Sequence, residues 1–166
     1  MITGKENMLT ALGEAYLMEK ETRLFYEEAA EKAVHEDAKR TFEHLSGWEE
    51  QHMEYIMTLY KGIMEDWAMV TFEEFRNRSE ASVTEAGIPL KDLEGKITTY
   101  RITDEMGALT LAMEIEGKAY NLYRRLSKDS PDTNAQVIFR EMMEQEKKHI
   151  EHLKELRVRL ADVYNT

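Results

Sequence analysis

The feature that most constrains the fold is an internal repeat. A shift of the sequence by 97 residues, with no gap, places many residues of the first half on identical residues of the second half. The identical pairs are Leu12 and Leu109, Ala15 and Ala112, Glu19 and Glu116, Tyr26 and Tyr123, Ala38 and Ala135, Phe42 and Phe139, Glu49 and Glu146, His52 and His149, and Leu59 and Leu156. The chain is therefore expected to contain two copies of one structural unit that face each other.

Each unit is predicted to be a helical hairpin. The paired residues step by three and four positions, which places them on one face of a helix. The pattern breaks near residues 35–37 and again at Ser130–Pro131, where proline suits a helix start. Two prolines and eight glycines in 166 residues favour long helices over a turn-rich β fold. The hairpins are expected at about 5–65 and about 104–164.

The segment between the hairpins, about 66–103, decides the topology. It contains the sequence Gly-Ile-Pro at 87–89 and Glu-Gly at 94–95, so it is not one helix. Such a long connection is unusual in a small domain. A crossover that lets the second and third helices run parallel explains it. The predicted fold is all-α: a single ferritin-like four-helix bundle over residues 1–166, with a long crossover between helices 2 and 3.

Six residues that can bind metals lie on the apolar stripes rather than on the opposite helix faces. They are Glu19, Glu49, His52, Glu116, Glu146 and His149. Four carboxylates inside a bundle are very costly unless they are neutralised, and two divalent cations would neutralise them. The Glu-x-x-His spacing puts both side chains on one face, a helical turn apart, so that they can reach one metal centre. The alternative is a charge-rich bundle whose glutamates are solvated.

The donor set narrows the choice of metal. Carboxylate oxygen and imidazole nitrogen, with no sulfur, suit iron or manganese, and zinc or cobalt can substitute. The absence of cysteine excludes thiolate metal sites, disulfides and cysteine nucleophiles, and it is compatible with a reducing cytoplasm. A net charge of −11 with scattered Lys and Arg argues against a nucleic-acid partner. No apolar run approaches the length of a membrane span, and the first residues do not read as a signal peptide.

Other residues near the stripes have more than one interpretation. Tyr26 and Tyr123 lie two turns from Glu19 and Glu116. They would hydrogen-bond metal ligands, carry a transient radical, or serve as core tyrosines with satisfied hydroxyls. Trp48 precedes Glu49 and is expected to point away from the site. The remaining histidines are expected at the surface or at the rim of the site: His35, His44 and His152.

The motifs resemble a known family. The segments MEKETRLFYEEAA (18–30), FEHLSGWEEQH (42–52), IEGKAYNLYRRLS (115–127) and FREMMEQEKKH (139–149) look like the two halves of a rubrerythrin-type ferritin-like domain. The resemblance implies a non-haem centre with two iron ions. It further implies that Glu49 and Glu146 bridge the irons, that Glu19 and Glu116 are terminal ligands, and that His52 and His149 each bind one iron.

The chain departs from the family pattern in two respects. It has no cysteine-rich rubredoxin module, so the electron donor is expected to be a separate molecule. Ala119 stands where the family has an additional glutamate, which leaves a more symmetric ligand set. The resemblance implies an oxidoreductase that reduces hydrogen peroxide or O₂, and a homodimer. The alternatives are a ferroxidase or iron-storage protein, and a structural or regulatory bundle with a vestigial site. The absence of a clear fifth helix argues against a storage shell.

Overall fold

The computed structural model describes residues 4–64, 104–131 and 133–164. These residues form four α-helices and no strand: α1 (Gly4–Lys32), α2 (Glu36–Met64), α5 (Asp104–Asp129) and α6 (Thr133–Tyr164). The predicted all-α bundle of four helices is therefore confirmed in its coarse form. The expected crossover at about 66–103 lies outside the described residues. None of the described helices is long and apolar enough to cross a membrane.

The two short breaks in the helices follow local chemistry. Glu36 and Asp37 open α2, where acidic side chains favour the positive end of the helix dipole, and Lys32 and Lys128 lie in the last turns of α1 and α5. At the second break the backbone N–H of Ser130 donates to the carbonyl of Leu126 at 3.0 Å, which closes the last turn of α5. Each break is short enough to make the helices it joins antiparallel neighbours.

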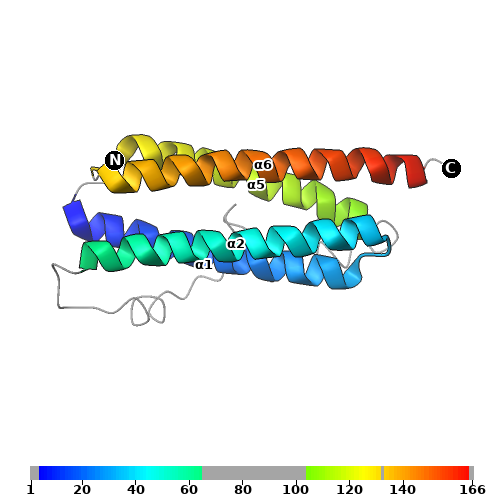
Figure 1. Ribbon diagram of the computed structural model, residues 1–166, viewed down its shortest axis with the longest axis horizontal. Helices are drawn as coiled ribbons and strands as arrows, with labels where there is room; N and C mark the ends of the chain where they lie inside the picture. Colours follow the sequence, from blue (N-terminus) through cyan, green and yellow to red (C-terminus); the bar gives the residue numbers. More distant parts are fainter. Residues whose placement is uncertain (1–3, 65–103, 132, 165–166) are drawn as a thin grey trace.

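The two hairpins pack face to face (Figure 1). Within each hairpin the helices lie side by side, while α2 contacts α6 and α1 contacts α5 across the bundle. At one end, the backbone N–H groups of Val34 and His35 each donate to Glu105 at 2.9 Å, and the Tyr164 hydroxyl donates to the same carboxylate at 2.5 Å. The starts of α2 and α5 therefore lie at the same end of the bundle, so these two helices run in the same direction.

Glu105 ties three elements together at that end. It is only 1% exposed, and the His35 ring also contacts it. Burial would raise the pKa of Glu105, but hydrogen bonds from His35, Tyr164 and Val34 bring it below its ordinary value. One ionised carboxylate on α5 thus forms hydrogen bonds with the α1–α2 turn and with the end of α6.

The apolar core consists of two clusters, one toward each end of the bundle. One contains Tyr26, Phe42 and Leu109, and the other contains Leu12, Tyr123 and Phe139. Residues that the 97-residue shift pairs lie in opposite clusters, so the repeat acts as an approximate twofold rotation about an axis across the bundle. The six stripe residues with metal-binding side chains lie between the clusters, at the middle of this axis.

Candidate metal centre

All four helices contribute to one buried cluster of charged side chains. α1 provides Glu19, and α2 provides Glu49 and His52. α5 provides Glu116, and α6 provides Glu146 and His149. The helix period explains this, since each residue occupies the same stripe as the apolar residues of its helix. The whole set is at most 2% exposed: Glu19, Glu49, His52, Glu116, Glu146 and His149. The six predicted residues therefore come together in the protein interior, and their glutamates are not solvated.

The cluster divides into two overlapping groups that can each hold a metal ion. One group consists of Glu19, Glu49, His52 and Glu146, and the other of Glu49, Glu116, Glu146 and His149. Within each group the potential ligand atoms lie within 4.8 Å of one another. Only Glu49 and Glu146 belong to both groups, so these two carboxylates lie where they can bridge a pair of ions.

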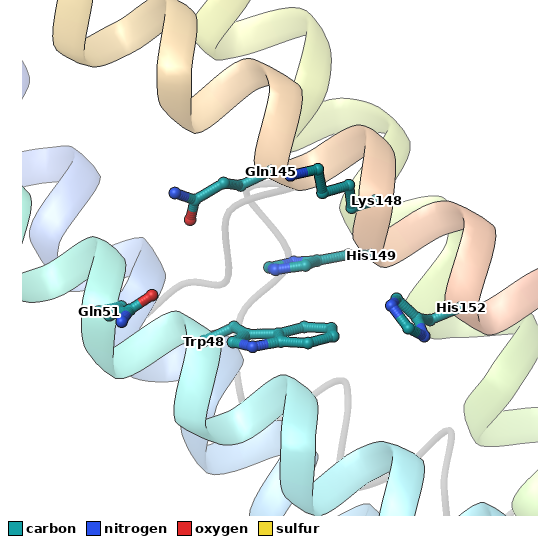
Figure 2. Close-up of a pocket in the computed structure, with 6 residues that line it drawn as sticks. All are labelled: Trp48, Gln51, Gln145, Lys148, His149 and His152. Carbon is teal, nitrogen blue, oxygen red and sulfur yellow. The ribbon is translucent and has the colours of Figure 1, made fainter.

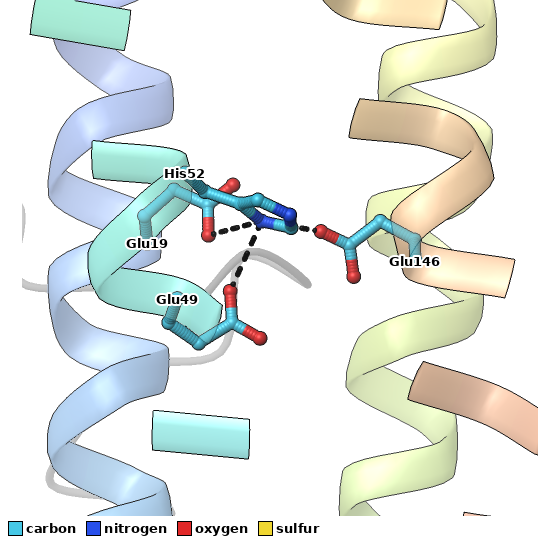
Figure 3. A group of neighbouring side chains, drawn as sticks. All are labelled: Glu19, Glu49, His52 and Glu146. Carbon is cyan, nitrogen blue, oxygen red and sulfur yellow. Dashed lines mark hydrogen bonds and ion pairs between the residues drawn. The ribbon is translucent and has the colours of Figure 1, made fainter. Parts of the chain in front are cut away.

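Each histidine points one ring nitrogen at three carboxylates. His52 Nδ1 lies 3.2 Å from Glu19 Oε2, 3.3 Å from Glu49 Oε2 and 2.8 Å from Glu146 Oε1 (Figure 3). His149 Nδ1 lies 3.3 Å from an oxygen of Glu49 and of Glu116, and 3.2 Å from Glu146 Oε2. The two imidazole rings are nearly parallel, with centroids 5.2 Å apart and an interplanar angle of 17°. Two equivalent donor sets thus lie next to each other.

The polar atoms of the cluster fit bound cations. Both carboxylate oxygens of Glu49, both of Glu146, and Oε2 of Glu116 are buried without a hydrogen-bond partner among the described residues, and so is His149 Nδ1. Buried polar groups are nearly always hydrogen-bonded, and orphaned ones require an explanation such as an ion. Oxygen and imidazole donors that converge in this way are those expected for iron, manganese or zinc.

Proton binding is the other way to neutralise this cluster. Burial raises the pKa of Glu116 to about 8, and the neighbouring charge of Glu146 adds to the rise. Burial and the Glu116 charge would also raise the pKa of Glu49, but contacts with Glu19 and both histidines lower it to about 2. Neighbouring carboxyls thus differ in protonation because their surroundings differ.

The carboxylates also change the pKa of the two histidines. Burial would lower the pKa of His52 and His149, yet the carboxylate charges around them raise it well above the usual value. Glu19 and Glu146 act on the first ring, and Glu116 and Glu146 act on the second. Metal ligands must lose these protons, so cations and protons compete for the cluster.

Two buried tyrosines connect the hairpins to the cluster. The hydroxyl of Tyr26, on α1, donates to Glu116 on α5, and the hydroxyl of Tyr123, on α5, donates to Glu19 on α1. Each tyrosine therefore bonds the glutamate of the opposite hairpin. These bonds orient the two carboxylates that belong to only one group each, which is the role of an outer partner to a metal ligand.

Sequence reasoning missed Gln145 and misplaced Trp48. Oε1 of Gln145 lies 2.9 Å from Nε2 of His52, on the side of the ring away from the carboxylates. Trp48 does not point away from the site, because its indole stacks on the His149 ring with centroids 5.0 Å apart and an interplanar angle of 9°. Their positions could have indicated a role at the site, since each directly precedes a glutamate of the cluster in the sequence.

The other histidines lie outside the cluster, as expected. His35 is half-buried against Glu105 at the end of the bundle, while His44 and His152 are exposed. Both exposed rings lie beside Trp48, with centroids 6.4 Å and 4.9 Å from the indole. His152 therefore occupies the rim of the site.

Comparison with known proteins provides no relative: no protein-family model, no curated protein and no solved structure matches the chain. The class of the protein therefore rests on its own residues. Its described residues form an all-α bundle of four helices with a buried Glu/His cluster that can hold metal ions.

Proposed function

We propose that the protein is a non-haem di-iron oxidoreductase of the rubrerythrin type, which reduces hydrogen peroxide or O₂ with electrons from a separate donor. The observation that carries this proposal is the pair of metal-binding groups that share Glu49 and Glu146. A structural ion needs a single closed shell of ligands, whereas shared carboxylates between two equivalent donor sets are typical of centres that hold two ions in a helical bundle.

The donor set supports one position for each ion. Glu19 and His52 would hold one ion, Glu116 and His149 would hold the other, and the two shared carboxylates would bind both. Four carboxylates balance the charge of two divalent cations, and Nδ1 of each histidine is the nitrogen that faces them. Iron is the proposed metal, with manganese or zinc as substitutes.

The residues around the centre would orient the ligands and exclude water. Two ferrous ions, when bound, would supply two electrons, which together with two protons reduce one peroxide to two water molecules. Tyr26 and Tyr123 hold the terminal carboxylates from the opposite hairpins, and the apolar clusters on either side limit solvent access along the bundle. Such a buried, fixed site strengthens the interaction of each ligand with the ions.

The proposal includes features that rest on the sequence resemblance. These are the ferritin-like crossover between α2 and α5, a homodimer, and a donor protein or small reductant that delivers electrons from outside the chain. The parallel directions of α2 and α5 support the crossover. A ferroxidase that oxidises Fe²⁺ as its substrate is the second candidate, because the buried Ala119 leaves the two donor sets symmetric.

Anaerobic loading with Fe²⁺, followed by separate additions of peroxide and O₂, tests the proposal. Stopped-flow absorption would follow the formation of ferric iron. We expect two irons per chain and faster oxidation by peroxide, followed by repeated turnover when a reductant is supplied. A protein that binds two irons, reacts only with O₂ and releases or stores the ferric product is a ferroxidase. A protein that binds no iron contradicts both candidates.

A further inference from the structure

The approximate twofold symmetry of the centre is broken directly next to the two shared glutamates. The shift of 97 residues relates Trp48 to Gln145, each of which directly precedes a shared glutamate on α2 or α6. Every predicted metal ligand is identical to its counterpart in the other hairpin, but an indole and an amide are different chemical groups. The environments of the two histidines must therefore differ.

His52 has a fixed hydrogen-bond acceptor behind it. With Nδ1 turned toward the carboxylates, Nε2 carries the proton and donates it to Oε1 of Gln145 at 2.9 Å. An acceptor at this position fixes the tautomer and ring orientation of a metal-binding histidine and raises its basicity. Loss of such a partner typically weakens metal binding by about 10–100-fold.

His149 has no corresponding acceptor. Its Nδ1 faces the carboxylates, as in His52, but Gln145 bonds Nε2 of His52 and the face of the His149 ring is stacked on Trp48 instead. It also lines a pocket of about 260 Å³ between α2 and α6, together with Gln51, Gln145, Lys148 and His152 (Figure 2). His52 does not line this pocket. Among the described residues, this pocket therefore borders one histidine of the pair and not the other.

We propose that Gln145 and Trp48 make the two metal positions unequal: the position at His52 holds its ion tightly, and the position at His149 exchanges its ion with the pocket. This inference rests on the proposed di-metal centre. It assigns Gln145 and Trp48 as positioning residues, because they act through the histidines. The labile ion is consequently the one that small molecules in the α2–α6 pocket can reach first.

Titration with Co²⁺ under anaerobic conditions tests this inference without any enzymatic turnover. The visible absorption of Co²⁺ reports its coordination, and competition with a chelator measures each affinity. We expect two binding steps whose dissociation constants differ by about 10–100-fold. His52→Ala should remove the tight step, whereas His149→Ala should remove the weak step.

Substitutions of Gln145 separate hydrogen bonding from packing. Gln145→Leu should weaken the tight step by about 10–100-fold, so that the two steps merge. Gln145→Glu keeps an acceptor for Nε2 and should restore the tight step. The matched control is Gln51→Leu, which makes the same chemical change in the same pocket but at a residue with no bond to a histidine. It should leave both steps unchanged.

Trp48→Gln provides an independent test, because it gives both hairpins an amide at the equivalent position. The weak step should then tighten toward the strong one. The inference is overturned if the wild-type protein binds both ions with equal affinity, if the Leu variants of Gln145 and Gln51 behave alike, or if Trp48→Gln leaves the weak step unchanged. Failure to bind any Co²⁺ would overturn the proposed function as well, so the two failures are distinguishable.

Discussion

The metal-free protein should lose stability as the pH rises. One cause is Glu116, whose pKa is about 8 in the folded protein and 4.5 when unperturbed. Because the folded state binds this proton more tightly, the stabilisation is fully present below pH 4.5 and is lost as the pH rises through about 8. Glu116 alone should lower the free energy of unfolding by about 1.4 kcal/mol per pH unit over this window, or ~4 kcal/mol between pH 5 and 8.

The histidines act in the same direction. The pKa of His52 and of His149 is raised well above 6.5, so their contribution is present below pH 6.5 and is lost above it, as each folded pKa is passed. Bound cations replace these protons, and deprotonated ligands bind cations better as the pH rises. The protein loaded with Fe²⁺ should therefore become more stable between pH 6 and 8, which is the opposite slope.

Urea denaturation followed by circular dichroism measures both slopes, with chelator-treated and anaerobically Fe²⁺-loaded protein at the same pH values. Glu116→Gln keeps the shape of the protonated carboxyl and should make the slope of the chelator-treated protein less steep by the contribution of one proton. Glu114→Gln, which changes an exposed carboxyl two residues earlier on α5, is the matched control and should leave the slope unchanged. Stability that is constant or rises between pH 6 and 8 in the chelator-treated protein would refute the reasoning.

Three further predictions concern individual side chains. Glu49→Ala and Glu146→Ala should each lower metal occupancy more than Glu19→Ala, because a bridging ligand serves both ions; elemental analysis that finds equal occupancy would exclude the bridging assignment. Tyr26→Phe should weaken metal binding by about 10-fold in chelator competition, and unchanged affinity would limit this tyrosine to packing. Glu105→Ala should destabilise the fold by ~1–3 kcal/mol in urea, since it leaves partly buried donors unpaired, while metal stoichiometry stays at the wild-type value; a loss of metal would show that the end of the bundle supports the site.

The cluster itself could be predicted because helix geometry links sequence spacing to position. Glu49 and His52 are three residues apart on an apolar stripe, and the same pair recurs 97 residues later. A helix places such residues on one face, and the cost of burying the charges then indicates cations. The four helices and their breaks followed from the same periodicity.

Features that depend on how the hairpins face each other could not be predicted in this way. The bond from Tyr26 to Glu116 crosses between hairpins, and periodicity within one helix contains no information about that register. The 97-residue shift pairs Glu105 with Met8. The repeat therefore could not indicate that Glu105 forms the contact at one end of the bundle. Gln145 and Trp48 differ at equivalent positions, and a search for identical residues passes over both.

Anomalous diffraction at the iron absorption edge, from crystals of anaerobically loaded protein, tests the central claim most directly. We predict two iron peaks between Glu49 and Glu146, about 3.5–4 Å apart, with Nδ1 of one histidine bound to each. A single peak, or density for iron only at surface carboxylates, would contradict a dinuclear centre in the middle of the bundle.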